Sequence, residues 1–201
     1  MISAIKLSYK VDEKEILSNI SITIQKNKIT VIAGKNGSGK STLLKILNHI
    51  ITPSNGSMKS EFEKAVPMLF QRPLALNKNL EDNFLLLNKI KKTKIDRTFY
   101  NLFNLKKLRE QKFSSLSEGE KQKVFISRLM SYNQDLLVMD EPNQNLDTES
   151  EEKFFNKLFT LKKSKTIIIA LHDMRLIKKF ADNLIILDKG KIIFNNLAVN
   201  Y

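Results

Sequence analysis

Cysteine is absent from this chain of 201 residues, and histidine occurs only at His49 and His172. The lack of cysteine excludes disulfide bonds, thiolate metal sites and a cysteine nucleophile, and it fits a reducing compartment. Long apolar runs are also missing. Stretches such as 166–171 fall far short of the roughly 20 residues that cross a membrane, and the N-terminus has no signal-peptide pattern. We expect a single domain over residues 1–201 that does not itself span a membrane.

Acidic residues are outnumbered, with 21 Asp and Glu against 34 Lys and Arg, which gives a formal net charge of +13. This excess favours anionic partners such as a nucleotide, a nucleic acid or an anionic membrane leaflet. The chain is also rich in Lys, Asn and Ile together, a bias that codon composition alone produces. The net charge therefore carries little weight for function.

A glycine-rich loop follows a β-branched run and precedes apolar residues at helical spacing. The loop has the pattern G-x-x-x-x-G-K-S from Gly34 to Ser41, between residues 29–32 and 43–47. Glycines let backbone N–H groups surround a phosphate, and the following helix adds unpaired N–H groups. Lys40 would reach the β- and γ-phosphates, and Ser41 would bind Mg²⁺. A glycine turn that merely precedes a helix would share part of the pattern, but the strand before it favours a phosphate site.

A second apolar run begins after Asp135 and ends in two carboxylates, Asp140 and Glu141. A continuous apolar run is typical of a buried parallel strand, and ligands in such sheets bind beyond the strand's carboxyl end. Adjacent side chains point to opposite sides, so one carboxylate can serve Mg²⁺ and the other a water molecule. Two solvated loop acids are the alternative, which the earlier phosphate loop makes less favourable. His172 ends a further run, 166–171, whereas His49 fits a packing or surface position in the first helix.

The remaining periodicities predict an α/β fold in which an N-terminal antiparallel sheet precedes the glycine loop and a helical segment is inserted later in the chain. Alternating apolar residues, among them Ile5, Leu7 and Tyr9, predict short half-buried strands joined at a polar turn over 12–14. The other expected elements are a helix from Lys40 to near Ile51, a strand over 66–70, helices within about 72–131, a helix from an Asp173 N-cap through Phe180, and a hairpin over 184–194.

Ser117 and Glu120 have the spacing of a capping box, so helix initiation alone accounts for both residues. Gly119 lies between them and fits that interpretation poorly. Glycine in a first turn lowers helix stability unless the backbone must approach something closely.

In this order the motifs closely resemble those of the nucleotide-binding subunit of ATP-binding cassette (ABC) transporters. The similarity covers nearly the whole chain, about residues 5–194, and it implies a phosphate-loop NTPase core of the RecA-like type with an N-terminal antiparallel β-subdomain and an inserted helical subdomain. The matching segments are the Walker A loop at Gly34–Ser41, the Q-loop at Gln71, the signature at Leu116–Glu120, the Walker B strand at Leu136–Asp140, the carboxylate Glu141, the D-loop at Asn145–Asp147 and the switch histidine His172. Tyr9 falls where the family stacks an aromatic ring on adenine, although the residue pattern alone also allows a sheet position.

The resemblance implies a site for ATP and Mg²⁺. Lys40, Glu141 and His172 would be catalytic, and Ser41, Gln71 and Asp140 would hold the metal. The nucleotide contacts implied by the family are Tyr9, Gly34, Asn36, Gly37, Ser38, Gly39, Lys40, Ser41, Thr42, Gln71, Ser117, Gly119 and Asp147.

The resemblance also implies partners. They are a second copy bound head to tail around two ATP molecules, transmembrane permease subunits and, indirectly, a substrate-binding protein, with no nucleic acid. The chain would act peripherally at the cytoplasmic face of the membrane. Residues 70–83 resemble importer subunits for oxyanions such as tungstate or phosphate.

Two alternatives remain. A soluble ABC ATPase of DNA repair, translation or cofactor assembly would usually carry a coiled-coil insertion or a second cassette, which this chain lacks. A regulatory module without turnover would not need Lys40, Asp140, Glu141 and His172 together.

The signature departs from the family at Glu118 and Glu120, where glycine and glutamine are usual. Two carboxylates would then lie near a polyanion. Attraction between the helix dipole and Glu120 would offset part of the repulsion. The strength of nucleotide-driven closure then depends on how far this attraction offsets the repulsion.

Overall fold

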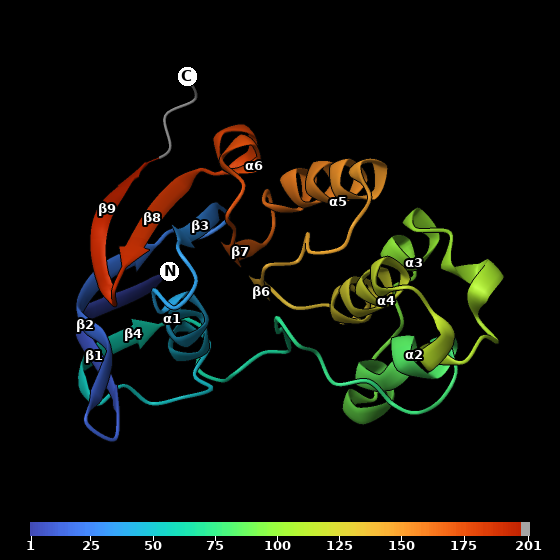
Figure 1. Cartoon of the computed structure of the whole chain (residues 1–201), viewed down its shortest axis with the longest axis horizontal. Coiled ribbons are helices and arrows are strands. Elements are labelled where there is room, and N and C mark those ends of the chain that lie inside the picture. The colour runs from blue at the N-terminus through green and yellow to red at the C-terminus, as the bar shows by residue number, and fades with distance from the viewer. Residues whose placement is uncertain (198–201) are drawn as a thin grey trace.

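The computed structural model describes residues 1–197, which form two β-sheets and a set of helices (Figure 1). Strands β1 (Ile2–Val11), β2 (Lys14–Ile24) and β4 (Asn55–Ser60) make an antiparallel sheet in the order β2-β1-β4. The central sheet has the order β5-β6-β7-β3-β8-β9. Its strands are β3 (Ile29–Gly34), β5 (Met68–Leu69), β6 (Leu136–Asp140), β7 (Thr166–Ala170), β8 (Asn183–Asp188) and β9 (Lys191–Leu197). All neighbours in it are parallel except the β8–β9 hairpin.

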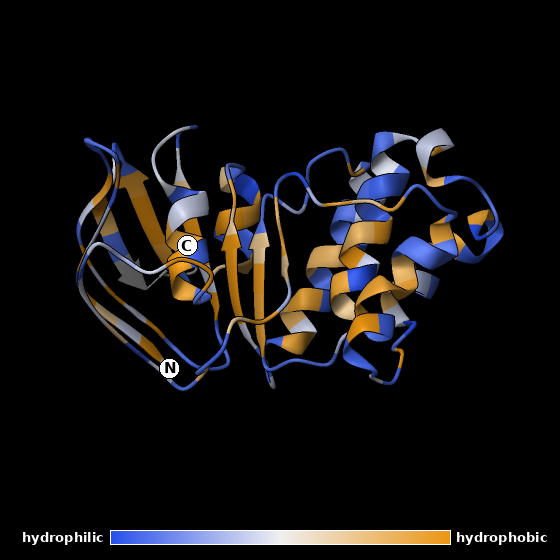
Figure 2. Ribbon diagram, turned by 90° about the horizontal axis from the view of Figure 1, so that it is seen from below, coloured by the Kyte–Doolittle hydropathy of each residue, from blue (hydrophilic) through white to orange (hydrophobic). Residues whose placement is uncertain are grey.

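Strands β6 and β7 are apolar except for Asp140 and Thr166 at their ends, because both faces of the sheet are covered. Every residue of β6 and β7 is buried, and these strands are among the apolar ribbons at the centre of Figure 2. Val138 and Ile168 face one core, shared with α1 (Lys40–Leu47) and the antiparallel sheet. Leu137 and Ile167 face the other, shared with α5 (Thr148–Leu161) and α6 (Met174–Phe180). Helix α1 therefore lies between the two sheets (Figure 1).

Between β5 and β6 the chain forms the helices that the Leu and Phe spacing predicts. They are α2 (Leu80–Lys91), α3 (Thr98–Leu102), η1 (Leu105–Leu108), η2 (Phe113–Ser115) and α4 (Glu118–Met130), which lie together at one end of the molecule (Figure 1). Phe84 and Tyr100 are fully buried there, with ring centroids 4.6 Å apart.

The two sheets and the inserted helices confirm the fold class predicted from the sequence. Assignment of residues 1–201 to a single domain stays a prediction, and residues 198–201 lie outside the described residues.

The N-terminal strands are longer than expected, and one of their residues was wrongly placed. Ile5 is 54% exposed instead of half-buried beside Leu7. Lys6 has φ +51°, and the β1–β2 register shifts between Ala4 and Leu7. This irregularity reverses the side of the sheet on which successive side chains lie, so Ile2, Ala4 and Leu7 are buried.

Two further boundaries were wrong. Helix α1 ends at Leu47 and not near Ile51, because the buried Asn48 side chain bonds both the N–H and the carbonyl of Val66. His49 consequently lies beyond the helix, exposed and at φ +56°. Strand β5 has only two residues of the predicted 66–70.

No helix within residues 1–197 combines the length and the apolar character needed to cross a membrane.

Candidate functional site

The glycine loop joins the end of β3 to the start of α1 and is closely packed against strands β2 and β8. Gly34 has φ +147°, and a Cβ built on it would lie 2.3 Å from the carbonyl oxygen of Leu187 in β8. Gly39 has φ +104°, and its Cβ would lie 2.7 Å from the Leu17 side chain of β2. Only glycine fits both positions. Gly39 is also the N-cap of α1, so no capping side chain bonds the first N–H groups of that helix, which can bind an anion.

Lys40 begins α1 and turns back into the loop. Its side chain is 5% exposed, and its ammonium donates to the carbonyl oxygens of Gly34 at 2.9 Å and Lys35 at 3.2 Å. The Nζ atom lies 3.7 Å from Oε1 of Glu141. Burial lowers the pKa of the Lys40 ammonium, and the carboxylates of Glu141 and Asp140 oppose this shift. A buried cation is thus held where the glycine loop would place a phosphate.

Glu141 is the meeting point of the predicted catalytic residues. It follows β6 at φ +49° and is 7% exposed. Its carboxylate accepts a hydrogen bond from Gln71 Nε2 at 3.2 Å and is contacted by the side chains of His172 and Gln144. Residues from four separate segments therefore converge on one buried carboxylate. Gln144 is absent from the sequence predictions, and its position three residues after Glu141 is the signal that could have found it. In the structure its N–H donates to the Glu141 carbonyl at 3.3 Å.

Asp140 is buried beside Ser41 and is suited to a metal. Burial raises the pKa of its carboxyl, and a hydrogen bond with Ser41 opposes the shift. Its Oδ1 atom is buried without a hydrogen-bond partner in the described part of the chain. Residues 1–197 contain no cluster of three or more His, Cys, Asp or Glu side chains that could enclose a metal. Mg²⁺ does not need one, because it is commonly bound by one or two protein oxygens together with substrate phosphates and water. Ser41 and Asp140 fit that pattern.

A cavity of about 640 Å³ opens beside the loop. Eight predicted residues line it: Asn36, Gly37, Gly39, Lys40, Ser41, Thr42, Gln71 and Glu141. Four others line it that the sequence did not reveal, namely Lys14, Glu15, Ile16 and Lys189. They come from two hairpins, and nothing in their local sequence distinguishes them from other residues of those hairpins. Tyr9 is not among the lining residues; it pairs with Leu17 across β1–β2 and packs on the core around α1.

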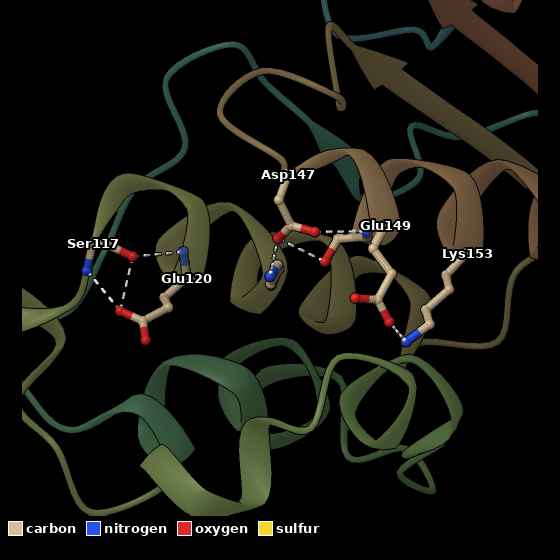
Figure 3. A network of polar contacts seen from close by, with 7 residues as sticks. Ser117, Glu120, Asp147, Glu149 and Lys153 are labelled. Carbon is tan, nitrogen blue, oxygen red and sulfur yellow. Dashed lines mark hydrogen bonds and ion pairs between the residues drawn. The ribbon is translucent and has the colours of Figure 1, made fainter.

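The signature segment forms the predicted capping box at the start of α4 (Figure 3). Ser117 Oγ accepts from the Glu120 N–H at 3.3 Å, and the Glu120 carboxylate accepts from the Ser117 N–H and hydroxyl, each at 2.8 Å. Glu118 pairs with Lys121 at 2.7 Å. Both unusual carboxylates of the signature therefore have partners within the chain.

Gly119 meets a steric demand inside the molecule. A Cβ on Gly119 would lie 2.7 Å from the carbonyl oxygen of Asn145. The signature helix thus starts directly against the loop after Glu141. Sequence reasoning explained this glycine by close approach of a partner, and the fold supplies a reason within one chain.

Asp147 caps α5 and faces α4 (Figure 3). Its carboxylate accepts from the Ser150 N–H at 2.8 Å and pairs with Lys123 at 2.6 Å. The Lys123 ammonium and the Ser150 N–H hold the pKa of Asp147 well below its usual range. Six of the predicted nucleotide contacts do not line the cavity that holds Lys40, namely Tyr9, Gly34, Ser38, Ser117, Gly119 and Asp147.

Comparison with known proteins identifies the family. A sequence model of the family "ABC transporter" matches residues 17–144. The phosphonates import ATP-binding protein PhnC of Fusobacterium nucleatum is 34% identical over 90% of this chain and 86% of that protein. The chain belongs to the ABC transporter family.

Other relatives within the family differ in what their names say they import. The zinc import ATP-binding protein ZnuC of Acinetobacter baylyi is 33% identical over 89% of this chain and 70% of that protein. Among solved structures, the bacterial ABC transporter cassette MJ0796 superposes with a TM-score of 0.83 at 23% identity over the full length of both chains, in a dimeric form and in a post-hydrolysis form bound to ADP and Pi. That likeness supports the fold. The chain is an ATP-binding cassette with the phosphate-loop ATPase fold, of the kind that serves transporters.

We predict that Asp140→Asn stabilises the cassette in the absence of nucleotide and metal. The folded-state pKa of Asp140 is raised, so its charged form destabilises the fold above that pKa. The penalty disappears as the pH falls through the folded pKa to the unfolded value. The variant should gain about 1 kcal/mol in free energy of unfolding at neutral pH, and the gain should shrink toward about pH 4.

Urea unfolding in the presence of a chelator measures both quantities. Asp135→Asn, at the exposed start of the same segment, is the matched control and should change little. An Asp140→Asn chain that is less stable than the parent at neutral pH would contradict the prediction.

Proposed function

We propose that this cassette hydrolyses ATP with Mg²⁺ and energises solute import through separate membrane subunits. The observation that carries the proposal is the convergence of Lys40, Gln71 and His172 on the buried Glu141 carboxylate beside the glycine loop. A polyphosphate in the loop would accept the hydrogen bonds of the Lys40 ammonium in place of the carbonyls of Gly34 and Lys35. Glu141 would then be freed to polarise the attacking water, with His172 next to it.

Ser41 and Asp140 would hold Mg²⁺, and Gln71 would reach the same ion from its loop. When bound, the ion would supply charge stabilisation to the phosphate oxygens. Support comes from the buried, unpartnered Oδ1 of Asp140, which lacks the ligand that a carboxylate oxygen in such a position requires.

A second copy would complete the site. Ser117, Gly119 and Asp147 carry the family's signature and D-loop positions but do not line the cavity of their own chain. In a head-to-tail pair they would face the phosphates held by the other copy, with the start of α4 presenting N–H groups. Stacking of Tyr9 on adenine is supported by the family resemblance alone, since Tyr9 is not among the residues that line the cavity. The dimeric form of the cassette MJ0796 supports the pairing of two copies.

The membrane partners would be permease subunits at the cytoplasmic face, with a substrate-binding protein acting indirectly. Gln71 joins the active carboxylate to the segment leading into the helical insertion, so it can transmit the state of the nucleotide to that surface. An oxyanion cargo is supported by residues 70–83 and by the name of PhnC, whereas the name of ZnuC supports a metal cation. A soluble ATPase role has no supporting observation in the site.

Lys40→Ala should lower Mg²⁺-dependent ATP hydrolysis by at least about 100-fold, because the phosphate loop loses its side-chain cation. A phosphate-release assay on the purified chain, with and without Mg²⁺, measures this. Lys45→Ala, on the same helix but outside the cavity lining, is the control and should keep its activity. Undiminished turnover in Lys40→Ala would refute the assignment.

Glu141→Gln should bind ATP yet hydrolyse it slowly, because the amide keeps the shape of the side chain but cannot act as a base. Trapped ATP should then shift the mass measured by light scattering from monomer to dimer. Glu149→Gln, an exposed carboxamide replacement on α5, controls for the loss of charge. If the variant stays monomeric with ATP bound, adding Glu118→Gly and Glu120→Gln separates a blocked signature from a wrong dimer model, which predicts no dimer in either chain.

The cargo is tested on the complete transporter reconstituted in lipid with its substrate-binding protein. Tungstate, molybdate or phosphate should stimulate ATP hydrolysis if the oxyanion proposal is correct. Stimulation by zinc or an amino acid alone would reject the oxyanion cargo and leave the import function intact.

A further inference from the structure

The turn between β8 and β9 is docked onto the phosphate loop. The Gly190 N–H donates to the Ser38 carbonyl at 3.0 Å, and the Ser18 N–H of β2 donates to the Gly190 carbonyl at 2.9 Å. A Cβ on Gly190 would lie 2.4 Å from the Ile16 carbonyl oxygen. This turn therefore has a fixed position against both the glycine loop and the β1–β2 hairpin.

Lys189 occupies the turn in an unusual backbone conformation. It has φ +45°, which glycine and asparagine tolerate better than lysine does. The hydrogen bonds of the Gly190 N–H and carbonyl hold the turn beside it in place. In this position Lys189 lines the same cavity as Lys40, Ser41 and Glu141.

The charge of Lys189 is not neutralised by the protein around it. No carboxylate among residues 1–197 lies within 4.0 Å of its ammonium, whereas Lys40 is paired with Glu141. Lys14 lines the cavity as well, and the other acid there, Glu15, is opposite Lys10 across the β1–β2 hairpin. The cavity lining therefore includes two lysines, Lys14 and Lys189, that form no ion pair within residues 1–197.

We propose that Lys189 is a nucleotide-binding residue that contacts the negatively charged phosphates of the bound nucleotide from outside the glycine loop. This inference rests on the proposed ATP site and adds a second cation to it, supplied by a hairpin far along the chain. The ammonium on its flexible stem would act as a point charge toward the phosphate chain. Because the side chain is exposed, the contact should be sensitive to salt.

Calorimetric titration of the full chain with Mg²⁺-ADP, a non-hydrolysable ATP analogue and adenosine tests the proposal. Lys189→Met keeps the length of the stem and removes the charge. It should weaken binding of ADP and the analogue about fivefold at low ionic strength, and the loss should shrink at high salt. Lys189→Arg should restore affinity. Adenosine, which carries no phosphate, should bind the parent and Lys189→Met equally.

Lys191→Met is the matched control, since Lys191 is an exposed lysine of the same hairpin outside the cavity lining. Equal ADP affinities for Lys189→Met and Lys191→Met would overturn the inference, as would an equal loss for adenosine and ADP, which would indicate a purely steric role. A parent chain that binds no nucleotide would refute the proposed function itself. Binding by the parent with no effect of Lys189→Met would refute only the role of Lys189.

Discussion

The buried pair of Lys40 and Glu141 is the interaction on which the rest of the site depends. Each charge is removed from water, with exposed fractions of 5% and 7%, and a buried charge is costly unless a partner compensates it. At 3.7 Å the two charges compensate each other only in part, and carbonyls, Gln71 and His172 supply the remaining hydrogen bonds. The site is therefore held together by hydrogen bonds of a kind that a bound phosphate group could also make.

Parallel pairing explains how residues so far apart in sequence reach that pair. Strands β3, β6 and β7 run in the same direction, with Ile32 in register with Ala170 and Asp140 in register with Ala170 on its other side. Their carboxyl ends therefore share one edge, from which Gly34, Glu141 and His172 emerge. These strands were predictable because two covered faces demand continuous apolar runs, which are visible in the sequence. The glycine loop was predictable because its residue types are fixed by backbone conformation.

Contacts between distant segments could not be predicted in the same way. Ile5 was misplaced because the positive φ of Lys6 leaves no mark in an alternating pattern. The end of α1 depends on Asn48 finding Val66, a pairing that no local propensity encodes. Lys189 and Ile16 reach the cavity only because two hairpins pack on the loop. Local sequence therefore specified the strands and the loop, while the cavity walls depend on tertiary packing.

The acidic signature illustrates how local and intermolecular demands compete. Glu120 completes a capping box that stabilises the start of α4. Its carboxylate thereby accepts hydrogen bonds from the Ser117 hydroxyl and N–H. In a head-to-tail pair, Ser117 could turn toward a phosphate only after giving up the Glu120 carboxylate. Glu118 carries less of this conflict because Lys121 already neutralises it. The repulsion expected from two carboxylates is thus concentrated in Glu120, and in the proposed pair the strength of closure would depend on whether a phosphate competes successfully for the Ser117 hydroxyl.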